Sequence, residues 1–286
     1  MRVIFHLGCH GTDEERLISC LLHNHEALAA QGIAVPSPPR YRTLLRDTAR
    51  SLNGGTASAE VQQQVLDQIL DGQAAQRLVL SWENFLSYPQ WAVKDRLYPA
   101  GAERLRAFRR VLPGAEVEFH LAIRGMDSFL PLLAASQPDS TPALPDPQQL
   151  RWARLIEEIR TANPDVALTV WSDEDAPLIW PEILQALSGH GAGLALKGAD
   201  MLLAQVMSPE GLARMHSYLE RTPPESALQR RRVVAAFLDK FALSDRVDLE
   251  IDLPGWSADL LTALQATYAE DLAQIRRMPG VTLLTA

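Results

Sequence analysis

The chain has 286 residues, of which 47% are hydrophobic and 22% charged, and its 27 Lys and Arg against 35 Asp and Glu give a net charge of -8. This composition excludes a disordered chain, and the acidic balance argues against a broad nucleic-acid surface, which requires a basic face. Two cysteines are too few for a disulfide framework or a four-thiolate zinc site. No apolar run approaches the roughly 18 residues that span a bilayer, so we expect reduced thiols, no membrane span and a cytoplasmic protein.

The first half of the chain alternates between two hydrophobic patterns. Apolar and β-branched runs predict short buried strands, at 2–7, 33–35, 77–81 and 116–123. Apolar residues at helical spacing predict helices after these strands, at about 13–31, 41–52, 59–70, 102–112 and 126–136.

The second half begins with a loop that holds four prolines between 137 and 147 and is long enough to cover a substrate. Beyond it the patterns predict helices at 149–162 and 258–277, and strands at 166–171 and 281–284. Strands that alternate with helices indicate a parallel sheet covered on both faces. The predicted fold is therefore α/β, with three layers, a central parallel sheet flanked by helices, and a helix-rich C-terminal part.

The loop Gly8–Glu15 follows the first predicted strand and precedes a helix. Such a unit presents free backbone N–H groups and the positive end of a helix dipole to an anion, as in P-loop proteins, although the full signature G-x-x-x-x-G-K-[ST] is absent. The sequence from Thr12 to Glu15 has the pattern T-x-x-E, which predicts a capping box between these two residues. A capping box would close the helix's own anion site.

Residues 6–12 (HLGCHGT), the helix after them and the ending QGIAVP at 31–36 resemble the N-terminus of P-loop sulfotransferases. Further stretches that are similar to strand ends of that family are 80–83 (LSWE), 112–115 (LPGA) leading to Arg124, and 170–175. The resemblance covers about the first 190 residues. It implies one P-loop-type α/β domain over residues 1–286 that transfers a sulfuryl group from 3′-phosphoadenosine-5′-phosphosulfate to a hydroxyl of a carbohydrate or other small acceptor.

The resemblance also implies roles for particular residues. In it, backbone amides of the loop hold the phosphosulfate of the donor, and an arginine at a strand end holds its 3′-phosphate. The donor-binding residues carried over in this way are Gly8, Cys9, His10, Gly11, Thr12 and Arg124. Glu83 or His10 would take the proton of the acceptor hydroxyl. A structural role is the alternative for each: an ion pair for Arg124, a solvated loop position for Glu83, and a small buried residue for Cys9.

The chain departs from the family's pattern where the donor would bind. The family's loop lysine aligns with Gly11, its next glycine with Asp13, and its serine after the arginine with Leu132. A charge pair at about 5 Å is worth roughly 3 kcal/mol at an effective dielectric of 20, so a missing lysine and added carboxylates weaken binding of a polyanion by several kcal/mol. The second hypothesis is therefore a catalytically inactive relative that acts as a binding or assembly module.

Three arrangements separate the hypotheses. An active enzyme predicts an open cleft near Arg124, with Glu14 and Glu15 turned outward. A binding module predicts a formed capping box and an arginine tied to a carboxylate. A third hypothesis, a metal- or acid-assisted hydrolase, predicts that the side chains of His10, Asp13 and Glu14 converge on a metal ion.

Overall fold

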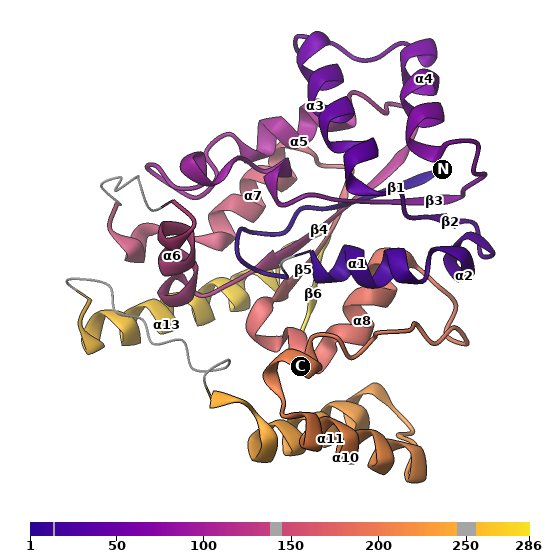
Figure 1. The fold of residues 1–286 in the computed structure, drawn as a ribbon. Coiled ribbons are helices and arrows are strands. Elements are labelled where there is room, and N and C mark those ends of the chain that lie inside the picture. Colours follow the sequence, from indigo (N-terminus) through magenta and orange to yellow (C-terminus); the bar gives the residue numbers. More distant parts are fainter. Residues whose placement is uncertain (14, 138–144, 245–255) are drawn as a thin grey trace.

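The computed structural model describes residues 1–13, 15–137, 145–244 and 256–286. At its centre lies a parallel sheet of six strands in the order β2-β3-β1-β4-β5-β6 (Figure 1). The strands are β1 (Arg2–His6), β2 (Ile33–Ala34), β3 (Arg77–Ser81), β4 (Glu116–Ile123), β5 (Ala167–Ser172) and β6 (Val281–Leu284). The predicted α/β fold with a parallel sheet flanked by helices is confirmed, and each strand lies within a residue or two of its predicted range.

Helices cover both faces of this sheet. On one face lie α3 (Arg42–Ser51), α4 (Ala59–Leu70), α5 (Gly101–Arg109), α6 (Met126–Ala135), α7 (Trp152–Ala162) and α13 (Ala258–Ile275). On the other face lie α1 (Arg16–His23), α2 (His25–Ala29) and α8 (Ala176–Ser188). Side chains of β1 alternate between the two cores, because Val3 and Phe5 pack on the first face and Ile4 on the second. No helix of the described residues is long and apolar enough to cross a membrane.

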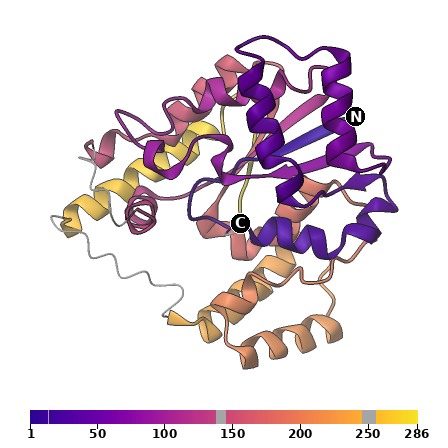
Figure 2. The ribbon, with the colours of Figure 1, turned by 45° about the horizontal axis from the view of Figure 1, so that its top comes forward.

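The C-terminal part adds α9 (Leu203–Val206) and a hairpin of α10 (Pro209–Arg221) and α11 (Ala227–Phe241). In both ribbon views the hairpin lies to one side of the layered body (Figure 2). It has a small core of its own, formed by Leu203, Met207, Met215 and Val234. The helix-rich C-terminal part is thus an addition to the sheet and its covering helices.

One predicted helix is wrong. The segment 13–31 forms two helices because the chain breaks at Asn24, whose φ of -107° and ψ of 15° are not helical. The Asn24 side chain donates to the C=O of Cys20 at 2.8 Å and of Lys197 at 2.9 Å, and it accepts the N–H of Lys197 at 2.8 Å. Tertiary bonds to a distant loop therefore replace helix continuity at this residue.

The strand order places a topological switch point at β1. The chain passes from β1 to β2 and β3 on one side, and then crosses to β4 and β5 on the other. In open α/β sheets the crevice at such a point, outside the carboxyl ends of the strands, is where ligands bind. The loops after β1 and β4, with the end of β5 beside them, are therefore the expected ligand site.

Candidate functional site

The loop after β1 folds back on itself. Gly8 has φ of 52° and Gly11 has φ of 75°, left-handed conformations that favour glycine. Just after Gly11, the hydroxyl of Thr12 donates back to the C=O of Cys9 at 2.8 Å, and the N–H of Thr12 donates to the same oxygen at 3.3 Å. The loop that the resemblance assigns to the donor's phosphosulfate is thus a tight, internally bonded turn.

The predicted capping box is wrong. The hydroxyl of Thr12 is engaged with Cys9, and Glu15, the residue before α1, has φ of 64° and no side-chain bond to the helix. The Glu15 carboxylate instead forms an ion pair with Arg42 at 2.6 Å. Asp13 takes the capping role, since its Oδ2 accepts the N–H of Leu17 at 3.0 Å. The negative charge at the positive end of the α1 dipole is therefore the protein's own carboxylate.

Arg124 follows β4 directly and lies between the loop and the end of β5. Its Nη1 donates to the C=O of Gly11 at 2.5 Å, and its Nη2 lies 3.4 Å from Oδ2 of Asp173. The indole N–H of Trp152 donates to the C=O of Arg124 at 2.6 Å and fixes the backbone there. The side chain of Arg124 is 17% exposed, and its Nε is buried without a partner among the described residues.

Two carboxylates, those of Asp173 and Glu174, follow β5 and lie beside Arg124 and Gly125. The Asp173 side chain is 14% exposed, and burial raises its pKa to about 7 even though the nearby Arg124 favours the charged form. Glu174 accepts the N–H of Gly125 at 2.8 Å with Oε1, and its Oε2 accepts the hydroxyl of Tyr268 at 3.0 Å. The carboxyl ends of β4 and β5 are thus followed by two carboxylates that bond to the chain itself.

Gly11 and Leu132 are in contact across the loop and α6. A Cβ atom placed on Gly11 would lie 3.3 Å from the Cβ of Leu132, which is tighter than an ordinary contact. These are the two positions at which the chain lacks the family's lysine and serine. A side chain at residue 11 would therefore require Leu132 to shift by a few tenths of an ångström, and the left-handed backbone at Gly11 adds strain.

His10 is buried and both of its ring nitrogens have partners. Nδ1 lies 2.9 Å from the hydroxyl of Tyr98, and Nε2 lies 3.1 Å from Oδ1 of Asn84. Because an amide oxygen only accepts, Nε2 carries the proton and Nδ1 accepts from Tyr98. Burial lowers the pKa of His10, which keeps the ring neutral. Glu83, the other predicted base, is exposed on the 3-10 helix Glu83–Phe85.

Cys9, within the loop, and His6, at the end of β1, are both buried. Cys9 is 1% exposed, and burial raises the pKa of its thiol well above the usual range. His6 is 2% exposed and bonds to Ser81 through Nδ1 at 2.9 Å. No group of three His, Cys, Asp or Glu side chains within the described residues could hold a metal ion. His10 bonds to Tyr98 and Asn84, and Glu14 lies outside the described residues.

The structure thus brings Arg124 against the predicted loop at Gly11 and adds Tyr98 and Asn84, which the sequence did not single out. Tyr98 and Asn84 position His10 through hydrogen bonds to its two ring nitrogens. No pattern in the sequence indicates either contact, and the backbone of Tyr98 is left-handed, with φ of 43°. Asp173 belongs to the strand-end segment 170–175, and the carboxyl ends of parallel strands are where ligand-binding residues are expected. No protein-family model, curated protein or solved structure matches this chain.

Proposed function

We propose that this protein is a catalytically inactive relative of the P-loop sulfotransferases, a binding module that does not use the nucleotide donor. The observation that carries the proposal is the engagement of Arg124 with the C=O of Gly11 and the carboxylate of Asp173. An arginine that holds a 3′-phosphate must leave these partners. Because its guanidinium already bonds to these oxygens in a partly buried site, an incoming phosphate gains less than it would from a free arginine.

Two further contacts support the same function. The Asp13 carboxylate occupies the N-terminus of α1, where a phosphosulfate would bind. Two like charges about 5 Å apart repel by roughly 3 kcal/mol at an effective dielectric of 20. The approach of Leu132 to Gly11 crowds the place where the family's lysine side chain would begin. Charge and shape at this loop therefore both oppose the donor.

One observation favours the second candidate, an active sulfotransferase. The Nε of Arg124 is buried without a partner in the described part of the chain, and its contact with Asp173 is long for an ion pair. A buried donor that lacks a partner is uncommon in a folded protein, and an anion would supply one. In this candidate Glu83 or His10 acts as base, and His10 must first give up its bond to Asn84.

Titration calorimetry with 3′-phosphoadenosine-5′-phosphate, the donor's desulfated product, separates the two. We expect no binding heat up to millimolar nucleotide for the wild type, for Arg124→Ala, and for Arg2→Ala as the control at the opposite end of the sheet. Micromolar binding by the wild type and by Arg2→Ala, lost in Arg124→Ala, would establish the donor site and overturn the proposal.

A further inference from the structure

Trp91 has the most exposed large hydrophobic side chain of the described residues, at 61% exposed. It ends the 3-10 helix Pro89–Trp91 in the connection between β3 and α5. The chain beside it is well anchored, because the next residue, Ala92, is fully buried and its C=O accepts the N–H of Tyr98 at 2.6 Å. The indole is therefore held at the surface by a packed segment.

Tyr88 joins this indole to a half-buried arginine of α5. The centres of the Tyr88 and Trp91 rings are 5.9 Å apart, in an edge-to-face arrangement. The Cζ atom of Arg104 lies 5.8 Å from the centre of the Tyr88 ring, within the range of a cation–π contact. Arg104 also donates to the C=O of Asn84 at 2.9 Å and of Phe85 at 3.4 Å. A carbonyl carries no net charge, so these bonds leave the charge of the arginine without a counter-charge.

Two further arginines, Arg46 and Arg50, lie one turn apart on α3, which packs against α5 (Figure 1). Bonds to Asp47 and to the side chain of Tyr88 raise the pKa of Arg46, so its guanidinium lies beside the same phenol as Arg104. Arg50 is exposed. Burial lowers the pKa of Arg104, and the positive charge of Arg50 lowers it further, which brings the third arginine to this surface.

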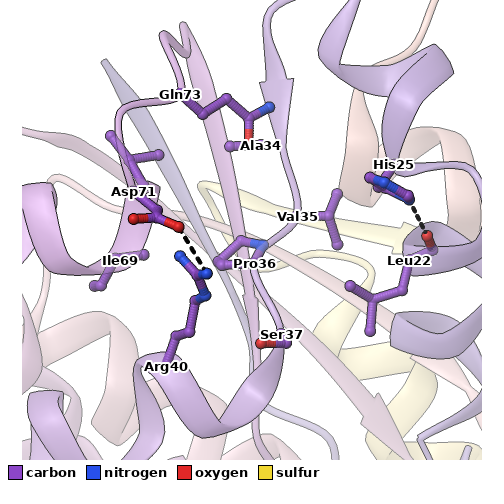
Figure 3. Close-up of a pocket in the computed structure, with 11 residues that line it drawn as sticks. Leu22, His25, Ala34, Val35, Pro36, Ser37, Arg40, Ile69, Asp71 and Gln73 are labelled. Carbon is purple, nitrogen blue, oxygen red and sulfur yellow. Dashed lines mark hydrogen bonds and ion pairs between the residues drawn. The ribbon is translucent and has the colours of Figure 1, made fainter.

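These residues form an arginine–aromatic patch, which consists of Arg46, Arg50, Tyr88, Trp91 and Arg104. Among the described residues, the ion pair of Arg46 with Asp47, at 2.8 Å, is the only one that its arginines make. Arg40, just before α3, is by contrast neutralised by Asp71 at 2.8 Å (Figure 3). The patch therefore has three guanidinium groups against one paired carboxylate, on a chain whose net charge is -8.

The chemistry of the patch fits an acidic polypeptide. Trp, Tyr and Arg are the residue types that carry most of the binding energy at protein interfaces, and carboxylates complement arginine there. A nucleic acid would extend its negative charge over the rest of an acidic chain, whereas a short acidic segment confines it to the patch. Arg46 and Arg50 are about 6 Å apart along the helix axis, close to the spacing of alternate side chains on an extended segment.

We propose that the arginine–aromatic patch binds an acidic segment of a partner protein, with an apolar side chain of the segment on Trp91 and its carboxylates against Arg46 and Arg50. Arg104 supports the patch from below through Tyr88. The patch shares no residue with the switch-point site around Arg124. The proposal is therefore independent of whether the donor nucleotide binds.

The test compares two variants of the patch with two matched controls. Trp91→Ala removes the indole and Arg50→Gln removes one charge, both at exposed positions where the fold depends little on the side chain. Leu228→Ala, at 54% exposed on α11, and Arg277→Gln, exposed beyond the end of α13, make the same kinds of change elsewhere. Random short peptides displayed on phage are selected on the intact wild-type protein. Enriched sequences are then synthesised and titrated by fluorescence anisotropy.

We expect the enriched peptides to carry several Asp or Glu residues and at least one large apolar residue. Their affinity should be at least tenfold weaker for Trp91→Ala and roughly fivefold weaker for Arg50→Gln, and unchanged for Leu228→Ala and Arg277→Gln. Peptides with Asn and Gln in place of Asp and Glu should bind the wild type at least tenfold more weakly. Added salt should weaken binding to the wild type more than binding to Arg50→Gln.

The proposal is overturned if no peptide is enriched, if the enriched peptides are not acidic, or if Trp91→Ala and Arg50→Gln bind them as the controls do. Tighter binding of a short oligothymidylate than of any selected peptide, lost in Trp91→Ala, would assign the patch to single-stranded nucleic acid instead. A wild type that sediments as a dimer while Trp91→Ala sediments as a monomer would assign it to a second copy of this chain. Arg124→Ala should bind the selected peptides as the wild type does.

Discussion

At the scale of single residues, burial sets the chemistry of the ion pair at the switch point. Asp173 is largely enclosed, and its pKa of about 7 lies above the value near 3.9 of an unfolded aspartate. The folded protein therefore holds a proton between about pH 4 and pH 7 that the unfolded chain releases. The stability that this group contributes is fully present below about pH 4 and is lost as the pH rises through 7.

Asp173→Asn imitates the protonated form and should remove this loss. We expect the variant to gain stability relative to wild type between pH 5 and pH 8, by an order of 3 kcal/mol, in urea unfolding at several pH values. Asp175→Asn, on the same 3-10 helix, is the matched control. A difference between Asp173→Asn and wild type that does not change with pH would show that burial does not raise this pKa.

Buried histidines act in the opposite direction. Burial lowers the pKa of both His6 and His120, so below the pKa of a free histidine the unfolded chain binds protons that the folded protein does not. Their contribution is present above about pH 6.5 and is lost in acid. Because wild type and Asp173→Asn share these histidines, the difference between the two pH curves isolates the aspartate.

At the scale of elements, the break between α1 and α2 shows where local sequence and tertiary contact disagree. Asn24 is buried at 5% exposed and makes three hydrogen bonds, two of them to Lys197. Alanine forms helices more readily than asparagine. We nevertheless expect Asn24→Ala to lower the free energy of unfolding by about 1–3 kcal/mol, because the N–H and C=O of Lys197 lose their bonds to the Asn24 side chain.

Chemical denaturation checks this expectation, with His23→Ala as the control. His23 is exposed in the last turn of α1, so its substitution changes helix propensity without removing a tertiary bond. An Asn24→Ala variant as stable as His23→Ala would mean that the bonds to Lys197 contribute nothing to folding.

The strands were predictable because a parallel strand buried on both faces reads as a short apolar run, such as 77–81. The helix break at Asn24 was not, because its cause lies in a segment 173 residues away. The capping of α1 failed for a related reason. The pattern from Thr12 to Glu15 fits a capping box, but the left-handed backbone at Glu15 delays the helix and leaves Asp13 as the acceptor.

The candidate site was predictable only in part. Strand-end logic located Arg124 and the loop after β1, because the carboxyl ends of parallel strands meet at one edge. It could not identify Asp173 as the carboxylate beside Arg124, since that pairing depends on the register of β4 with β5. Whether the site binds a donor nucleotide stays a prediction.

At the scale of the whole molecule, the α10–α11 hairpin has the smallest of the three hydrophobic cores among the described residues. Its core has four fully buried residues, whereas the two cores of the sheet each hold many more. It is joined to the body by ion pairs of 3.0 Å, Arg230 with Asp200 and Arg231 with Glu182, which are partly exposed and therefore worth about 1 kcal/mol or less each. Elements with few buried apolar contacts open locally before the global transition.

Met215→Ala tests whether the hairpin unfolds separately. Met215 is fully buried, so the substitution should cost about 2–5 kcal/mol within the hairpin. All six tryptophans lie outside α10 and α11. We expect faster hydrogen exchange in both helices, with exchange in β1 and β4 and the tryptophan fluorescence transition unchanged. If that transition shifts by the full cost instead, the hairpin belongs to the cooperative unit of the sheet, and its ion pairs bind it more strongly than their exposure indicates.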